Sequence, residues 1–235
     1  MLEVKAIHSH YGKSQVLQGV SFQLNEGDLV CLLGRNGVGK STTLKSIMGI
    51  VRPTRGSILL NGRELVGRQP FQIARAGVGY VPEDRRIFKS LTVHENLLMG
   101  IKGNRTGDSG DPWTVEMVYR TFPRLNERRE NKGIHLSGGE QQLLTVARTL
   151  MGNPKLLLVD EPTEGLAPLI ARDVLDMLAA IRKTGVTVFM VEQNLKAAIK
   201  IADRFYIMSK GQIVFEGDTA ALMAAEDVRR KYLEV

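Results

Sequence analysis

The segment that most restricts the fold of this chain is residues 34–42, which read GRNGVGKST. It follows a short apolar run, Leu29–Leu33, and leads into a helix-like stretch, Lys40–Met48. Its sequence matches the pattern G-x-x-x-x-G-K-[ST], which in this strand–loop–helix context indicates a phosphate-binding loop. The defining positions of the pattern are Gly34, Gly39, Lys40 and Ser41.

The residue types in this loop are those that phosphate binding requires. Glycines let the loop curl so that backbone N–H groups point at phosphate oxygens, and the start of the following helix adds a positive end. Lys40 can neutralise the β- and γ-phosphates, and the Ser41 hydroxyl can ligate Mg²⁺. The sequence therefore predicts a nucleotide site formed by Gly34, Arg35, Asn36, Gly37, Val38, Gly39, Lys40, Ser41 and Thr42.

Three nearly continuous apolar runs predict strands that are buried on both faces of a parallel sheet. They are Leu29–Leu33, Leu156–Val159 and Val186–Val191, and each is followed by a helix-like segment. This alternation of strands and helices predicts an α/β fold. Two further runs, Val16–Leu24 and Gly56–Leu60, are typical of strands in an antiparallel sheet.

The middle and the end of the chain follow other patterns. Residues 84–153 have a mainly helical pattern, interrupted by a polar, glycine-containing stretch at Lys102–Asp111 that predicts a flexible surface loop. Thr219–Leu233 predicts one or two short amphipathic helices. The helices expected after the second and third apolar runs are Ile170–Arg182 and Leu195–Ala202.

A pair of acidic residues ends one of the predicted parallel strands. Residues 156–161 read LLLVDE, so Asp160 and Glu161 fall at the carboxyl edge of the sheet, where open α/β folds bind ligands. Asp160 can hold Mg²⁺, and Glu161 can polarise an attacking water as a general base. The alternative is a solvated acidic turn, but the phosphate loop needs a magnesium carboxylate from a neighbouring strand.

A second segment combines a helix start with two glycines. Residues 136–142 read LSGGEQQ, and Ser137 and Glu140 have the spacing of a capping box. A capping box does not require the pair Gly138–Gly139, which weakens a helix start. Exposed N–H groups with no Cβ in the way form an anion site, so the sequence predicts a second phosphate-binding helix start.

The Lys40 loop, LSGGEQQ and LLLVDE, in this order, resemble the ATP-binding subunits of ABC transporters. The resemblance implies a P-loop NTPase fold with a parallel core and an N-terminal antiparallel β-subdomain at about 1–83 and 154–235, and an inserted helical subdomain at about 84–153. It implies a head-to-tail dimer in which ATP at the Lys40 loop of one subunit is covered by the LSGGEQQ segment of the other. The resemblance assigns Ser137, Gly138, Gly139 and Glu140 to nucleotide binding. It also places Tyr11 where an aromatic residue stacks on the adenine, although Tyr11 can equally be an ordinary tyrosine of a β-sheet.

The chain departs from the broad family at three places. Glu83 replaces the usual Gln after the strand Val78–Val81, where it can still reach the metal. Gln193 replaces the usual His that contacts the γ-phosphate; it can donate a hydrogen bond but carries no titratable charge. In the loop after Glu161, residues 164–167 read EGLA instead of the usual SALD.

These departures together are similar to the second ATP-binding subunit of branched-chain amino-acid importers, through VPEDRRIF, EPTEGLAP and VEQN. The resemblance implies a related second ATPase subunit, membrane permeases and a periplasmic binding protein as partners. It also implies a peripheral position on the cytoplasmic face of the inner membrane. A urea or amide importer stays open as an alternative. Ile87 and Phe88 can face the permease or pack the helical subdomain.

Composition restricts the competing classes of protein. The net charge of +7, from 32 Lys and Arg against 25 Asp and Glu, is compatible with nucleic acid. However, ABC ATPases that act on nucleic acid carry coiled-coil insertions, zinc-binding cysteines or two fused units, and this chain has one cysteine, Cys31. We therefore expect no nucleic-acid partner. An exporter ATPase of the lipopolysaccharide type predicts Gln and His where Glu83 and Gln193 stand, and a P-loop kinase has no role for LSGGEQQ.

Overall fold

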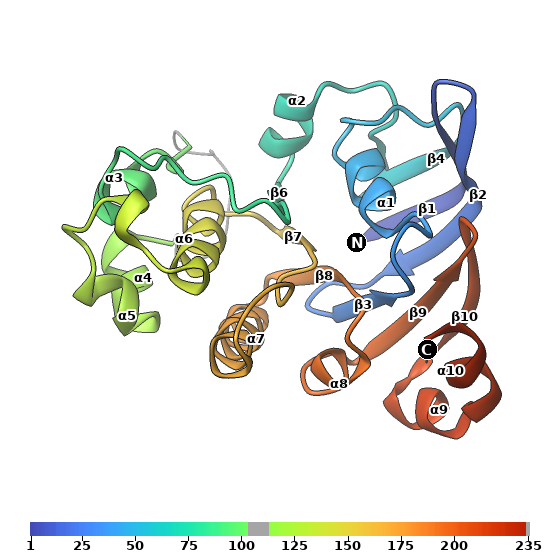
Figure 1. Ribbon diagram of the computed structural model, residues 1–235. Coiled ribbons are helices and arrows are strands. Elements are labelled where there is room, and N and C mark those ends of the chain that lie inside the picture. Colours follow the sequence, from blue (N-terminus) through green and yellow to red (C-terminus); the bar gives the residue numbers. More distant parts are fainter. Residues whose placement is uncertain (103–112, 234–235) are drawn as a thin grey trace.

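The computed structural model describes residues 1–102 and 113–233, which form two sheets and two groups of helices (Figure 1). The larger sheet consists of β3 (Leu29–Leu33), β6 (Val78–Val81), β7 (Leu156–Asp160), β8 (Thr187–Glu192), β9 (Arg204–Ser209) and β10 (Gln212–Asp218). Their order is β10-β9-β3-β8-β7-β6, and all pairs are parallel except β10 with β9. The predicted α/β fold with a parallel sheet is confirmed.

The smaller sheet is antiparallel and depends on a strand that the sequence did not reveal. It consists of β1 (Leu2–Tyr11), β2 (Ser14–Leu24), β4 (Arg55–Leu60) and β5 (Arg63–Glu64), in the order β2-β1-β4-β5. The two predicted strands, β2 and β4, therefore both pair with β1. Tyr11 is the last residue of β1.

The helices divide between the sheets and a separate lobe. They are α1 (Lys40–Ile47), α2 (Pro70–Arg75), α3 (Val93–Leu98), α4 (Val115–Thr121), α5 (Pro123–Glu127), η1 (Gly133–His135), α6 (Gly138–Leu150), α7 (Pro168–Lys183), α8 (Leu195–Ala198), α9 (Thr219–Ala224) and α10 (Glu226–Tyr232). Figure 1 shows α3 to α6 gathered into a lobe at the left, apart from the sheets. The boundaries of this helical subdomain at about 84 and 153 stay a prediction.

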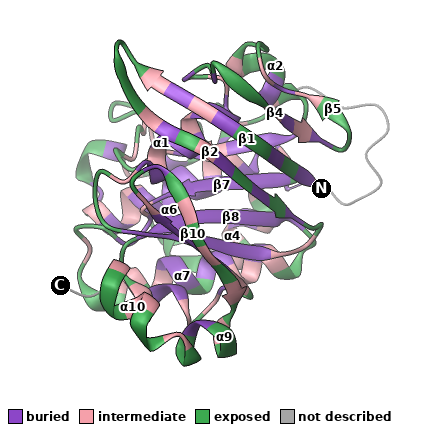
Figure 2. Cartoon of the chain, turned by 90° about the vertical axis from the view of Figure 1, so that its right-hand side faces the viewer, coloured by how far each residue is buried: buried purple, intermediate pink, exposed green. Residues whose placement is uncertain are grey.

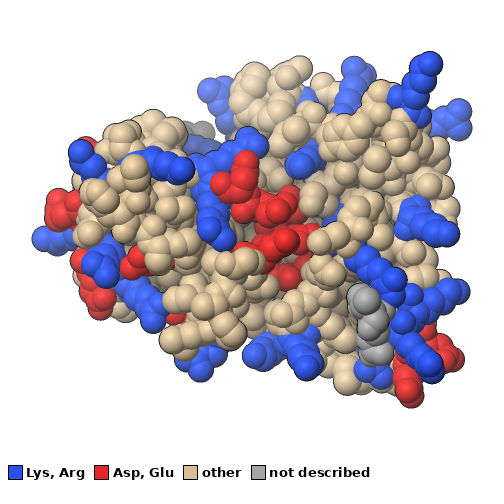
Figure 3. All heavy atoms as spheres, viewed as in Figure 1, with Lys and Arg blue, Asp and Glu red and all other residues tan. Residues whose placement is uncertain are grey.

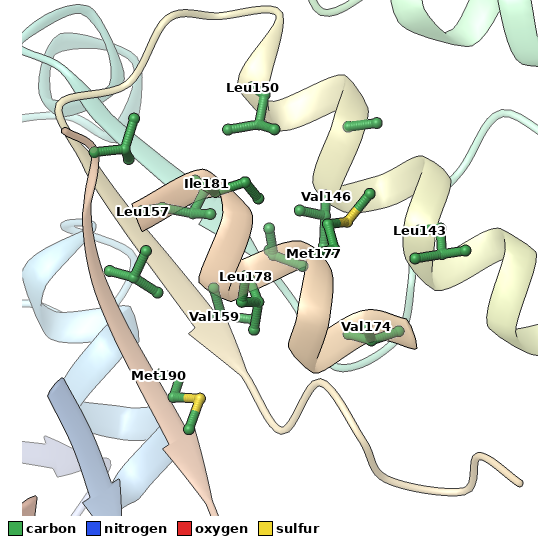
Figure 4. Close-up of a cluster of buried hydrophobic side chains, with 14 of the residues drawn as sticks. Leu143, Val146, Leu150, Leu157, Val159, Val174, Met177, Leu178, Ile181 and Met190 are labelled. Atoms are coloured by element: carbon green, nitrogen blue, oxygen red, sulfur yellow. The ribbon is translucent and has the colours of Figure 1, made fainter. Parts of the chain in front are cut away.

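Two apolar clusters pack on the two faces of the parallel sheet. Along β3, Leu29, Cys31 and Leu33 belong to the cluster on the side of α6 and α7, whereas Val30 and Leu32 belong to the cluster facing the small sheet. Figure 4 shows the first cluster, with side chains of α6, α7, β7 and β8 pointing toward one another. Burial on both faces explains why these strands read as unbroken apolar runs, and Figure 2 shows β7 and β8 buried along their length.

Several local expectations differ from the structure in length. The helix expected at Leu195–Ala202 ends at Ala198. The tail forms two short helices, α9 and α10, in agreement with the sequence. Of the polar stretch Lys102–Asp111, every residue after Lys102 lies outside the described residues. Among residues 1–102 and 113–233, no helix has the length and apolar character needed to cross a membrane.

Candidate functional site

The loop between β3 and α1 has a shape that only glycine permits at two of its positions. A Cβ at Gly34 would lie 2.6 Å from the Met208 carbonyl oxygen, inside van der Waals contact. Gly39 has a φ of +115°, and a Cβ there would lie 2.9 Å from a methyl group of Leu17. The loop is therefore held close against β2 and β9, with α1 beginning directly after it.

Lys40 is the first residue of α1 and bends back under the loop. Its side chain is 3% exposed, and its Nζ donates to the carbonyl oxygens of Gly34 at 2.8 Å and Arg35 at 3.1 Å. The same Nζ lies 3.0 Å from Oε1 of Glu161, the residue directly after β7. Lys40 thus links the loop after β3 to the segment after β7 through one buried ion pair.

Asp160 ends β7 and points at the start of α1. The Ser41 hydroxyl donates to its Oδ1 at 2.8 Å, and the Tyr80 hydroxyl, from β6, donates to its Oδ2 at 3.0 Å. Burial raises the pKa of Asp160 and outweighs these two hydrogen bonds, which lower it. Burial and the neighbouring Asp160 also raise the pKa of Tyr80.

The donor set at Asp160 fits a magnesium ion. The Ser41 hydroxyl and the Asp160 carboxylate are adjacent hard oxygen donors, and Mg²⁺ is commonly held by one or two protein ligands together with substrate phosphates. Within the described ranges, no group of three or more His, Cys, Asp or Glu side chains forms a metal cage. A site with few protein ligands is thus the kind that this geometry supports.

Glu161 combines a strained backbone with two charged contacts. Its φ is +42°, which is uncommon for a residue with a side chain, and its N–H donates to the Val191 carbonyl at 3.1 Å. Burial favours a higher pKa for Glu161, but the hydrogen bond with Glu164 and the ion pair with Lys40 prevail and lower it. The shared hydrogen bond raises the pKa of Glu164 to about 7.

Acidic side chains gather between the helical lobe and the sheets, as Figure 3 shows in red at the centre of the molecule. Glu164 is subject to repulsion from Glu161, Glu83 and Glu192. Such a group of like charges favours a bound cation or a shared proton. The raised pKa of Glu164 beside Glu161 favours a shared proton in this pair.

The LSGGEQQ segment forms the start of α6, in the helical lobe. Ser137 is the N-cap: its Oγ accepts from the Glu140 N–H at 3.3 Å, while Glu140 Oε2 accepts from the Ser137 N–H at 2.8 Å. The predicted capping box is confirmed. A Cβ at Gly139 would collide with Ile170 of α7. This glycine is therefore required by helix packing within one chain.

The profile of the ABC transporter family matches residues 17–164. The chain belongs to this family. It is 45% identical over 233 residues to the high-affinity branched-chain amino acid transport ATP-binding protein BraG of Pseudomonas aeruginosa, covering 99% of both chains. It is 31% identical over 234 residues to the lipopolysaccharide export system ATP-binding protein LptB of Escherichia coli K12, covering 99% of this chain and 96% of LptB.

A solved ABC structure has the same fold. The crystal structure of the ADP conformation of MJ1267, an ATP-binding cassette of an ABC transporter, superimposes with a TM-score of 0.82 at 28% identity, covering 97% of this chain and 96% of MJ1267. The ABC ATPase fold is thereby confirmed. The chain is an ABC ATPase, a nucleotide-binding protein whose ATP hydrolysis is coupled to transport.

The ABC ATPase brings together some of the expected site residues and separates others. Lys40, Ser41, Asp160 and Glu161 meet at the carboxyl ends of β3 and β7. Among the described residues, no hydrogen bond or ion pair joins the exposed Glu83 to Ser41 or Asp160. Gln193 is exposed and follows β8 at the same edge of the sheet, because Glu192 pairs with Leu33. Tyr11 and the LSGGEQQ residues lie apart: Tyr11 is 49% exposed at the end of β1, and Ser137, Gly138, Gly139 and Glu140 lie in the helical lobe.

The structure separates Ile87 from Phe88. Ile87 packs against the apolar cluster that joins the helical lobe to α7 and the parallel sheet, so the packing alternative holds for this residue. Phe88 is 45% exposed, and the Arg148 guanidinium lies 5.0 Å from the centre of its ring. Phe88 is thus the member of the pair that is accessible on the surface.

Sequence reasoning missed three residues of this site. Tyr80 holds Asp160 from a neighbouring strand, and Thr163 and Glu192 bond to each other beside Glu161. The one signal for Glu192 in the sequence is an acidic residue that ends a buried apolar run, as in LLLVDE. Tyr80 and Thr163 leave no local signal, because their partners are distant in sequence.

The Glu161–Glu164 pair predicts a pH dependence of stability. Since the pKa of Glu164 is raised to about 7 from 4.5, the folded ABC ATPase keeps a proton that the unfolded chain loses. The free energy of unfolding should therefore fall as pH rises from about 4.5 to about 7. Glu164→Gln should reduce this slope in urea unfolding, whereas Glu127→Gln, an exposed glutamate on α5, should leave it unchanged. Identical slopes for the wild type and Glu164→Gln would contradict the shared proton.

Proposed function

We propose that this chain is the ATP-hydrolysing subunit of an importer for branched-chain amino acids. The observation that carries the proposal is the 45% identity to BraG over 99% of both chains, against 31% to LptB. The same region contains Glu83 and Gln193, the two departures that resemble this importer group. An importer of urea or amides and, further away, an exporter like LptB are the alternatives.

The geometry supports specific roles in ATP binding. The backbone N–H groups of residues 34–42 would hold the phosphates, and Lys40 would exchange its contacts with the Gly34 and Arg35 carbonyls for phosphate oxygens. Ser41 and Asp160 would hold Mg²⁺, with Glu83 as a further ligand. Mg²⁺ supplies charge neutralisation at the phosphates when it is bound. Tyr11 would stack on the adenine.

Hydrolysis would use the residues after β7 and β8. Glu161 would accept a proton from the attacking water, because its lowered pKa keeps it ionised and its backbone is fixed to Val191. Phosphate binding would release Glu161 from Lys40, its partner at 3.0 Å. Gln193 would donate a hydrogen bond to a γ-phosphate oxygen.

The separation of the two predicted phosphate sites supports a dimeric site. In one chain α6 begins in the helical lobe, whereas the Lys40 loop lies beside the small sheet. Ser137, Gly138, Gly139 and Glu140 would therefore cover ATP bound by a second ATPase subunit, identical or related. Membrane permeases, a periplasmic binding protein and a peripheral position on the cytoplasmic face of the inner membrane complete the proposal, with no nucleic-acid partner.

The solute can be tested on the complete transporter. The chain, purified with its membrane permeases in lipid vesicles, should hydrolyse ATP several times faster when leucine-loaded binding protein is added. Urea and short amides with the same binding protein should give no stimulation. Stimulation by urea, or by no solute at all, would contradict the proposal and favour one of the alternatives.

The role of Glu161 can be tested separately. Glu161→Gln should bind ATP with unchanged affinity, lower the hydrolysis rate by roughly 100-fold or more, and trap a closed dimer detectable by size-exclusion chromatography. Glu26→Gln changes an exposed glutamate in a turn and should behave as the wild type. A hydrolysis rate that survives Glu161→Gln would remove this residue from the role of base.

A further inference from the structure

One buried carboxylate beside the site has no part in the steps above. Glu192 ends β8, the strand that lies between β3 and β7, and is 3% exposed. In the sheet register Glu192 is the partner of Leu33, the residue directly before the phosphate loop, and its neighbour Val191 is the partner of Asp160. Glu192 therefore lies between the two strand ends that supply the phosphate loop and Glu161.

The two oxygens of Glu192 bind two different segments. Oε1 accepts hydrogen bonds from the Thr163 N–H at 3.1 Å and from the Thr163 hydroxyl at 2.7 Å. Oε2 accepts from the N–H groups of Gln193 at 3.2 Å and Asn194 at 3.4 Å. One carboxylate thus joins the segment after β7, which begins with Glu161, to the segment after β8, which begins with Gln193.

These contacts make the carboxylate tolerable in the interior. Burial raises the pKa of Glu192, and the hydrogen bonds from Thr163 and Asn194 oppose this. A buried carboxylate without such donors would be strongly destabilising, and hydrogen bonds to a charged acceptor are among the stronger ones in proteins. Both segments are therefore held by charge-assisted bonds, which fix loop positions more firmly than neutral contacts do.

We propose that Glu192 is a positioning residue, which fixes the segments carrying Glu161 and Gln193 relative to each other for ATP hydrolysis. The proposal rests on the proposed roles of those two residues. A second contact has the same effect, because the Glu161 N–H donates to the Val191 carbonyl at 3.1 Å. Glu192 holds Thr163, two residues further along, so the backbone is fixed both at the strained Glu161 and just after it.

Conservative variants separate this role from a general effect on folding. Glu192→Gln preserves size but places an NH₂ group against one pair of N–H donors, so one segment loses its acceptor. The other segment keeps only an uncharged acceptor, which binds more weakly, so both segments are loosened. Thr163→Val removes the hydroxyl donor alone, whereas Thr163→Ser keeps it. Glu64→Gln is the matched control, because Glu64 Oε1 also accepts from backbone N–H groups, those of Ile58, Leu65 and Val66, but in the small sheet.

The test measures kcat, ATP affinity and amide hydrogen exchange on the full chain. Glu192→Gln should lower kcat by about 10- to 100-fold, the scale of a small misplacement of catalytic groups, with ATP affinity within about twofold of the wild type. Thr163→Val should lower kcat less, and Thr163→Ser and Glu64→Gln should not lower it. Without nucleotide, Glu192→Gln should accelerate exchange at both Thr163 and residues 193–194.

The outcomes that overturn the proposal are distinct. The positioning role is contradicted if kcat is unchanged in Glu192→Gln, or if ATP affinity falls by the same factor as kcat. It is also contradicted if hydrogen exchange is unchanged at either segment. If Glu192→Gln does not fold, the Thr163→Val and Thr163→Ser pair decides by the same criteria. Hydrogen exchange can be measured without ATPase activity. A wild-type chain that fails to hydrolyse ATP would therefore contradict the proposed function. The exchange rates would still show whether Glu192 links the two segments.

Discussion

The parallel pairing of β3, β8 and β7 is the constraint on which the site depends. Backbone hydrogen bonds place Leu33 beside Glu192 and Asp160 beside Val191, so the three strands end at the same edge of the sheet. Because these strands are buried on both faces, their polar residues can be placed only where the strands end. The phosphate loop, the acidic pair and Gln193 follow directly from these ends.

The electrostatics of this edge follow from the same arrangement. Asp160, Glu161, Glu164 and Glu192 gather at the ends of two strands, and each is compensated in a different way. Asp160 accepts from Ser41 and Tyr80, Glu161 pairs with Lys40 and shares a hydrogen bond with Glu164, and Glu192 accepts from backbone and hydroxyl donors. Lys40 is a buried cation that pairs with Glu161 of this group, and ATP would compete with its present partners.

Local motifs could be predicted from the sequence, and contacts between distant segments could not. The loop at residues 34–42 and the acidic end of β7 are visible because neighbouring residues carry the chemistry. β1 was missed because a bulge interrupts its alternation at Ala6, which has a φ of +45°. A Cβ at Gly56 would collide with the carbonyl oxygens of Lys5 and Ala6 at this bulge, a contact that no periodicity predicts. Gly139 likewise meets Ile170, a residue of another helix.

We propose that one chain carries two incomplete halves of an ATP site, which two chains complete. A crystal structure of Glu161→Gln with ATP and Mg²⁺ would show whether residues of two chains meet at one nucleotide. We predict ATP phosphates enclosed by residues 34–42 of one subunit, Mg²⁺ on Ser41 and Asp160, and Ser137 of the opposite subunit at the γ-phosphate. A structure with ATP bound at the Lys40 loop but Ser137 of every subunit remote from it, or with Mg²⁺ away from Asp160, would contradict the account.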